Sequence, residues 1–339
     1  MLGNARYLLR LIAAGLLLAL AGCATAPGIA PNVIVEDAHH SQGHVLAFAD
    51  AADVLASGGS DGAIRLWRLP DGARVRAWLA HGNSVYGLAF LQRDRLLLSA
   101  GYDGHLALWR RDGTLEHELR TPSPITAMTV HETRGVILTG HEDGHVRQWR
   151  LPDLAPVAEW ALHRRYVRAV AIHAATGTFA SSGADRQVRV WRGQDDSRDG
   201  GGRATSGTVA ETPRVLPEPP TAARDLVFTP DGRHLLGGGW FKLFRWNLAA
   251  STLQVLPTDH KGIIAALDLS ADGRTLASIS RQLDSAVLFL DPETGETRKR
   301  FQKHELCGEN ISLSRNGRWL ATTADDGSVR LWDLRRGEN

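Results

Sequence analysis

Cysteine and methionine are scarce in this chain, and neither sign of charge is in clear excess. Of 339 residues, two are Cys, two are Met and four are Tyr. Arg6 and Arg10 lie in residues 1–22, which contain no acid, so the rest carries 39 − 2 = 37 basic side chains against 37 acidic ones. Nucleic-acid-binding domains usually show a basic excess or stripe. We therefore expect no nucleic acid partner.

Sequence motifs of common cofactor and catalytic sites are also missing. The chain has no P-loop, no C-x-x-C-H haem motif and no Gly-rich dinucleotide fingerprint at a strand–helix junction. We therefore expect no cofactor, no metal site and no catalytic residues, and predict that the protein is not an enzyme.

Long apolar runs are limited to one, Leu11–Ala21, which follows Arg6 and Arg10. Eleven residues are too few to span a bilayer as a helix, but they are typical of the core of a secretory signal peptide. The run ends in Leu20-Ala21-Gly22-Cys23, which resembles the lipobox of bacterial lipoproteins.

This resemblance implies a signal peptide over 1–22 and a fatty-acylated Cys23, carrying groups such as palmitate, at the start of a tether over 23–31. Several acyl chains give stable membrane attachment. Ala24, rather than Asp, favours the outer membrane by resemblance to enterobacterial lipoproteins, with the folded body facing the periplasm; inner against outer membrane stays open. Acylation of Cys23 would leave Cys307 alone, so no intrachain disulfide is expected.

The rest of the chain is one unit repeated seven times. Each unit ends in an aromatic residue, and these recur every 40–43 residues apart from one interval of 55. They are Trp67, Trp109, Trp149, Trp191, Trp246, Phe289 and Trp332. A Ser or Thr lies ten residues before most of them, an Asp six before, and a His 22 before that Asp. Asp-Gly and Asn-Gly turns separate short alternating runs, which predicts four short strands per unit.

These aligned His, Ser or Thr, Asp and aromatic positions, which we call columns, resemble those of the WD-repeat β-propeller family over about residues 32–335. The resemblance implies an all-β, seven-bladed propeller of four-stranded antiparallel blades. It also implies a structural hydrogen-bond network in the four units that carry every column. Those residues are His39, Ser57, Asp61, Trp67; His81, Ser99, Asp103, Trp109; His163, Ser181, Asp185, Trp191; and His304, Thr322, Asp326, Trp332. Unit three lacks the His, and units five and six are degenerate.

Two features of the ends and spacing refine this fold. The last unit stops without a fourth strand, so we expect Val33–Val35 to complete it and close the ring, which removes exposed strand edges. The interval of 55 holds a polar, Gly-rich insertion over 193–211, between the third and fourth strands of blade four. We interpret it as a mobile loop, either a tolerated surface insertion or a segment that orders on a partner.

Two patterns imitate catalytic sites. His141-Glu142-Asp143-Gly144-His145 matches the H-E-x-x-H motif of zinc peptidases, but its alignment with other units places it on a strand turn rather than on the helix that this chemistry needs. We interpret its His and Glu residues as decorations of that turn, available to a partner. Repeated His, Ser and Asp sets suggest triads, but they recur in each blade, so we interpret them as structural.

A partner surface is predicted at the rim that carries the turns between second and third strands, which resemblance to the family identifies as a common binding face. Tyr, Trp and Arg are enriched in binding hot spots. The expected partner-binding residues are Tyr86, Tyr102, Tyr166, Arg168, Glu142 and Trp240, and Arg224, His44 and Asp325 map to the same rim. An alternative is that Tyr simply prefers half-exposed strand ends.

We therefore predict a monomeric, non-enzymatic protein–protein interaction scaffold or adaptor, anchored to the bacterial envelope and bound to other envelope proteins. Two alternatives stay open: a ligand-binding or enzymatic propeller that uses its central channel, and an envelope structural protein that contacts cell-wall polymer.

Overall fold

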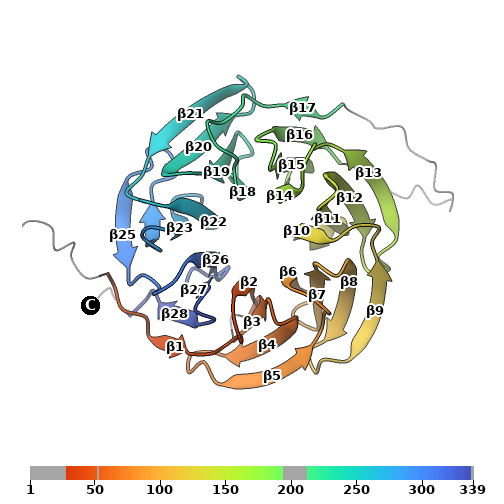
Figure 1. The fold of residues 1–339 in the computed structure, drawn as a ribbon, viewed down its shortest axis with the longest axis vertical. Helices are drawn as coiled ribbons and strands as arrows, with labels where there is room; N and C mark the ends of the chain where they lie inside the picture. Colours follow the sequence, from red (N-terminus) through yellow and green to blue (C-terminus); the bar gives the residue numbers. More distant parts are fainter. Residues whose placement is uncertain (1–27, 52, 194–211, 337–339) are drawn as a thin grey trace, which may run out of the picture.

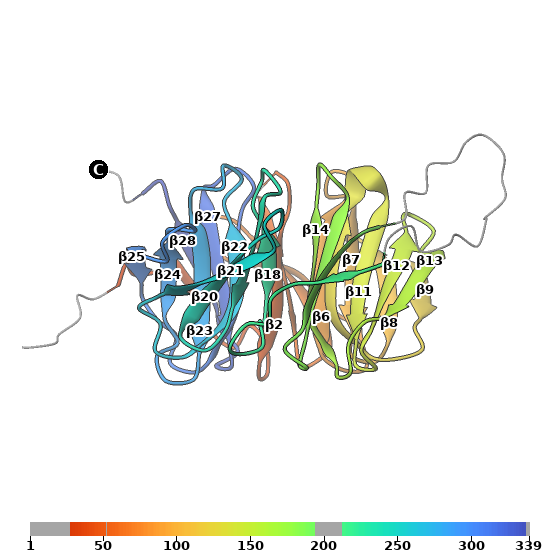
Figure 2. The same cartoon turned by 90° about the horizontal axis from the view of Figure 1, so that it is seen from above.

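The computed structural model describes residues 28–51, 53–193 and 212–336. They form seven four-stranded antiparallel sheets arranged in a ring (Figure 1). Seen from the side, the inner strands run along the axis of the ring (Figure 2). The one helical element among the described residues is the 3-10 turn η1 (Glu132–Arg134). The predicted seven-bladed, all-β propeller is therefore confirmed.

Each blade is numbered here in chain order, with its strands running from the inner to the outer edge of the ring. Blades one and two are β2 (Gly43–Phe48), β3 (Val54–Gly59), β4 (Ala63–Arg68), β5 (Arg74–Leu79) and β6 (Val85–Leu91), β7 (Leu96–Gly101), β8 (His105–Arg110), β9 (Leu115–Arg120). Blades three and four are β10 (Ile125–His131), β11 (Val136–His141), β12 (His145–Arg150), β13 (Pro156–Ala161) and β14 (Val167–His173), β15 (Thr178–Gly183), β16 (Val188–Arg192), β17 (Arg214–Val215). Blades five and six are β18 (Leu226–Phe228), β19 (His234–Gly238), β20 (Lys242–Asn247), β21 (Thr252–Pro257) and β22 (Ile263–Leu269), β23 (Leu276–Arg281), β24 (Val287–Leu290), β25 (Thr297–Phe301). Blade seven is β26 (Gly308–Leu313), β27 (Trp319–Ala324), β28 (Val329–Asp333) and β1 (Val33–Val35).

The core lies between neighbouring blades. Every residue of β3 is buried, whereas the outermost strand β5 is almost wholly exposed. The clusters of buried side chains join two sheets each: Trp67 of blade one packs with Trp319 and Leu331 of blade seven. Because one face of a sheet must be covered by another sheet, a single blade has no core of its own, and stability belongs to the ring.

Ring closure occurs as predicted. β1 pairs antiparallel with β28, with Val33 opposite Leu331 and Val35 opposite Val329. The preceding residues also contact the ring, because Ile29 forms a bridge beside Phe301 of blade six. Ile29, which lies in the segment expected to form the tether, therefore lies against the outer strand of that blade.

Several sequence predictions fall outside the described residues. These are the signal peptide over 1–22, Cys23 with the first part of the tether, and residues 194–211 of the insertion. The insertion does leave blade four after β16 and return at β17, which are its third and fourth strands. No helix in the described ranges is long and apolar enough to cross a bilayer.

Candidate interaction surface

In the four blades that carry every column, the His, Ser or Thr, and Asp side chains form a hydrogen-bond network. In blade one, the two ring nitrogens of His39 lie 3.0 Å from Asp61 Oδ1 and 2.8 Å from Ser57 Oγ. The indole of Trp67 donates to the same hydroxyl at 2.8 Å. The turn Asp also accepts from the backbone N–H of Ala63 at 3.1 Å, which fixes the turn. Every buried polar group of this set has a partner.

Blades two, four and seven repeat the His contacts but differ at the Trp. His81, His163 and His304 each bond their Ser or Thr at 2.7–2.8 Å and their Asp at 3.0–3.2 Å. The indole of Trp109 donates to Ser99 at 2.8 Å. The Trp332 indole donates instead to the Ile29 carbonyl at 2.9 Å, and that of Trp191 has no partner among the described residues. Trp191 and Trp332 therefore contribute packing, without the indole bond that the repeat pattern implies.

Blade six carries part of the same network, which alignment on the closing aromatic residue missed. His260 Nε2 lies 2.8 Å from Ser278 Oγ, and its Nδ1 lies 4.0 Å from Asp284. Ser278 follows His260 by 18 residues, the spacing seen between His39 and Ser57. The turn after β23 is longer than in other blades and displaces the downstream columns. Counting forward from the His would have found Ser278.

Blade three lacks the His of the column and has a different His in its network. His141 is fully buried, and its ring lies 2.8 Å from Thr139 Oγ1 and 3.0 Å from the Ser123 carbonyl oxygen. Trp149 donates to Thr139 at 2.8 Å. The interpretation of His141 as an exposed turn decoration was wrong, because this side chain replaces the missing His at Thr121.

These networks are structural groups rather than reactive ones. Burial lowers the pKa of His39, despite the opposing effect of Asp61. Burial raises the pKa of Asp61, but the hydrogen bond with His39, the Ala63 N–H and the nearby positive charges together outweigh it, and the pKa lies well below its usual range. Among the described residues, no group of three or more His, Cys, Asp or Glu is placed to hold a metal ion.

A ring of β-bulges aims side chains at the mouth of the central channel. In six inner strands the pairing register slips at one residue, so that this residue has no partner on the next strand. A bulge re-aims the side chain that it carries. The bulged residues are His44, Tyr86, Thr126, Arg168, Ala265 and Glu309.

All six line one hollow of about 500 Å³, which we call the upper mouth. Tyr102, Glu142 and Tyr166 line it as well, so five of the six predicted partner-binding residues meet in one place. Trp240 does not line it; its ring is 44% exposed and packs against Phe241 at 5.6 Å. Each bulged residue lies five positions after the His column, but the residue types at these positions differ, so the spacing alone does not mark a bulge.

Aromatic contacts link blades one and two at the upper mouth, and a further ring contact lies within blade four. The rings of His44 and Tyr86 stack 4.9 Å apart, and Tyr86 meets Tyr102 edge-on at 6.0 Å. Arg168 lies 4.9 Å from the centre of the Tyr166 ring, close enough for a cation–π contact. A hydrogen bond with Glu142 raises the pKa of Tyr102 to about 12.

On the opposite side of the mouth lies a charged cluster, of which the sequence had placed Asp325 on the rim but missed Arg281 and Glu309. Arg281 bonds Glu309 at 2.7 Å and lies 3.6 Å from Asp325. Burial raises the pKa of Glu309 to about 8; Arg281 opposes this, and the bond with Asp325 adds to it. Counted from Ser278, Arg281 takes the position of Tyr102 and Glu142, but alignment on Phe289 placed it at the Gly of the repeat, so column matching gave no signal for it.

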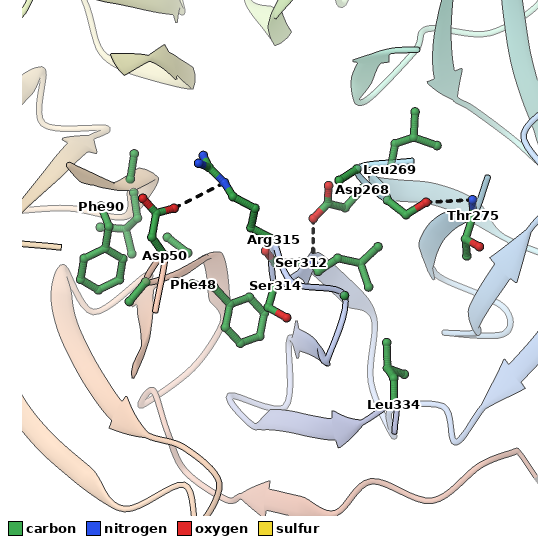
Figure 3. Close-up of a pocket in the computed structure, with 18 of the residues that line it drawn as sticks. Phe48, Asp50, Phe90, Asp268, Leu269, Thr275, Ser312, Ser314, Arg315 and Leu334 are labelled. Atoms are coloured by element: carbon green, nitrogen blue, oxygen red, sulfur yellow. Dashed lines mark hydrogen bonds and ion pairs between the residues drawn. The ribbon is translucent and has the colours of Figure 1, made fainter. Parts of the chain in front are cut away.

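A second hollow, of about 680 Å³, opens at the other end of the channel, here called the lower mouth (Figure 3). Its lining mixes apolar side chains, among them Phe48, Phe90 and Leu269, with charged and hydroxyl groups. Arg315 there is paired with Asp50 at 3.4 Å. Asp268 accepts a bond from the Leu313 N–H at 2.7 Å, and burial raises its pKa to about 7.

Comparison with known proteins bears directly on this architecture. The WD domain, G-beta repeat family matches residues 35–68, 72–110, 113–150, 155–192 and 295–333, which leaves the two degenerate units unmatched.

Similar proteins include Pre-mRNA-processing factor 19 homolog 2 of Arabidopsis thaliana, 28% identical over 66% of this chain and 40% of that protein. Apoptotic protease-activating factor 1 of Rattus norvegicus is 23% identical over 59% of this chain and 15% of its own length. Polyadenylation factor subunit 2 of Cryptococcus neoformans is 29% identical over 34% and 16%. The match thus spans less than half of each of these relatives. Together with the seven blades and their repeated networks, the family match shows that this chain belongs to the WD domain, G-beta repeat family.

Proposed function

We propose that the protein is a non-enzymatic interaction scaffold that binds a protein partner at the upper mouth. The observation that carries the proposal is the ring of six bulges, which turns side chains of six blades toward one hollow. A bulge interrupts strand pairing. Its repetition around one mouth fits a surface whose side chains are presented for contact.

The composition of the mouth favours a protein partner. Tyr86 is 36% exposed although it stacks on His44, so part of its ring is left for contact. Tyr and Arg supply large contact area with a polar tip, and they dominate binding hot spots. Family membership agrees with such a role. The name of one relative, a polyadenylation factor subunit, describes a component of a larger assembly.

A triple variant tests the surface. The change is Y86A/Y102A/Y166A, and the bait is full-length protein solubilised from membranes and recovered by affinity pull-down. We expect the variant to lose the most abundant specific partner by at least about tenfold, because hot-spot truncations often cost 2 kcal/mol or more each. The matched control is V75A/L115A/V255A, which removes exposed apolar side chains from the outer strands β5, β9 and β21. Identical partners for both variants and the wild type would refute the surface.

We further propose that lipid on Cys23 holds the propeller at a bacterial outer membrane, facing the periplasm. Support comes from the N-terminal sequence alone, since the relatives named above are eukaryotic. In a Gram-negative host, C23S should move the protein from the membrane fraction to the soluble fraction, because stable anchoring depends on the acyl chains. Labelling with a palmitate analogue should be lost in parallel, whereas C307S should keep both. Membrane-bound, unlabelled C23S would contradict the anchor.

A second candidate function is ligand binding at the lower mouth. Its volume is in the range of small-molecule sites, and Phe48, Phe90 and Leu269 give it an apolar part beside its polar groups. Native mass spectrometry of protein purified without added ligand checks this. A reproducible, stoichiometric small-molecule adduct that is lost in L269R would favour the candidate, and its absence in repeated preparations would count against it.

A further inference from the structure

The acids at the upper mouth all have donors already. Glu142 accepts from the Tyr102 hydroxyl, and Glu309 pairs with Arg281 at 2.7 Å. Asp225 accepts the backbone N–H groups of Leu226 and Leu267, both at 2.8 Å. The carboxylates of this hollow are therefore satisfied within the protein.

Two of the three guanidinium groups that line this hollow, in contrast, have no acceptor within the described residues. Arg281 has its carboxylate partners, but the side chains of Arg168 and Arg224 make no hydrogen bond or ion pair with any described residue. Arg168 lies over the Tyr166 ring, and its buried Nε has no acceptor. Burial lowers the pKa of Arg224, and its neighbours Arg168 and Arg281 lower it further. Half-buried cations without acceptors are costly, so the site is suited to an anion from outside the chain.

We propose that Arg168 and Arg224 bind a carboxylate of an acidic segment in the protein partner. This inference rests on the proposed function and specifies the chemistry of the partner. A carboxylate accepts two parallel N–H bonds from one guanidinium, which gives both strength and orientation.

The surroundings favour a carboxylate with an apolar neighbour. Glu142 lines the same hollow, and its carboxylate would repel a phosphate dianion more strongly than a singly charged group. Tyr86 and Tyr102 form an aromatic pair that lines the same hollow as the two Arg residues. An apolar side chain next to the acidic one in sequence would pack against these rings, so the segment should alternate or mix Asp or Glu with apolar residues.

Fluorescence anisotropy with labelled synthetic peptides tests this on the full chain. The probe is Gly-Glu-Leu-Glu-Leu-Gly, and the comparison peptides replace both Glu by Gln, by Lys or by phosphoserine. We expect the Glu probe to bind about tenfold or more tightly than the Gln peptide, and the Lys peptide not to bind measurably. Affinity for the Glu probe should fall as salt rises. Tenfold tighter binding of the phosphoserine peptide would overturn the assignment to carboxylate.

Variants connect the binding to the two Arg residues. R168Q and R224Q should each weaken the Glu probe about tenfold or more, whereas R315Q, which removes a paired Arg at the lower mouth, should not. R224Q should unfold at the same temperature as the wild type or higher, because it removes an unpartnered, half-buried cation. Equal binding of the Glu and Gln peptides, or equal affinity of R168Q and R224Q with the wild type, would overturn the proposal. A partner lost in the Tyr triple variant but retained by both Arg variants would refute carboxylate binding and leave the scaffold function standing.

Discussion

At the scale of single residues, blade three shows how one network is rebuilt from different positions. In blades one, two and four, the residue two after the Ser is Gly, and a Cβ there would lie 2.3–2.4 Å from the His ring or the turn Asp. Blade three has Thr121 in place of the His and His141 in place of that Gly. The two changes are coupled, because the pocket holds only one imidazole, which reaches it from either strand.

This coupling predicts a rescue. H141G should destabilise the protein by about 2–4 kcal/mol, since it leaves a cavity and removes a partner of buried Thr139. T121H alone should also destabilise it, because two rings would compete for one pocket. The double variant T121H/H141G should recover at least half of the loss. The measurement is equilibrium unfolding in urea, and a double variant no more stable than H141G would contradict the coupling.

Residue columns predicted much of the network and failed where chain length changes. The contacts of His39, His81, His163 and His304 follow from fixed spacing, because hydrogen-bond geometry ties each His to a Ser or Thr 18 residues later. Ser278 was missed because a longer turn shifts the columns downstream of it. The indole partner of Trp332 comes from residue 29, and such a distant contact leaves no mark on repeat spacing.

At the scale of elements, closure by β1 was predictable, whereas the bulges were not. A last blade with three strands leaves an open edge, and Val33–Val35 is the one unpaired strand pattern available. The bulged residues have no common chemical type, since His, Tyr, Thr, Arg, Ala and Glu all occur. Hydrophobic alternation reports the type of each side chain but not a shift in strand pairing. The orientation of these side chains toward the mouth therefore appears only in the structure.

The closing strand predicts a contrast between neighbouring residues. Val35 packs with the cluster around Trp319, whereas Ile34 is 40% exposed. V35D should cost about 2 kcal/mol or more, through lost apolar burial and a poorly solvated charge. I34D should stay within about 0.5 kcal/mol of the wild type. Urea unfolding measures both, and light scattering should detect oligomers of V35D alone, since a released β1 exposes the edge of β28. Equal effects of the two variants would argue against closure through this face.

At the scale of the whole molecule, polar bonds join the blades around the channel. Asp225 of blade five accepts from Leu267 of blade six, and Asp268 of blade six accepts from Leu313 of blade seven at 2.7 Å. Between blades seven and one, Thr323 donates to the Gly43 carbonyl at 2.9 Å. Burial raises the pKa of Asp225 to about 6 and that of Asp268 to about 7, because protein surrounds both carboxyls although they face the channel.

The raised pKa of Asp268 predicts a pH-dependent stability with a defined sign. Between its ordinary value of 3.8 and about 7, the folded protein holds a proton that the unfolded chain has released. This group therefore makes the free energy of unfolding fall as pH rises through that window. D268N keeps an acceptor for the Leu313 N–H but does not titrate. The unfolding temperature of D268N relative to the wild type should thus increase from pH 5 to pH 8, by about 1–2 °C for each kcal/mol relieved. Asp231 is the matched control, because a bond from Thr229 lowers its pKa and it stays ionised throughout this range. D231N should therefore give a constant offset, and a D268N difference equally flat with pH would show that the channel carboxyl is ionised in the folded ring.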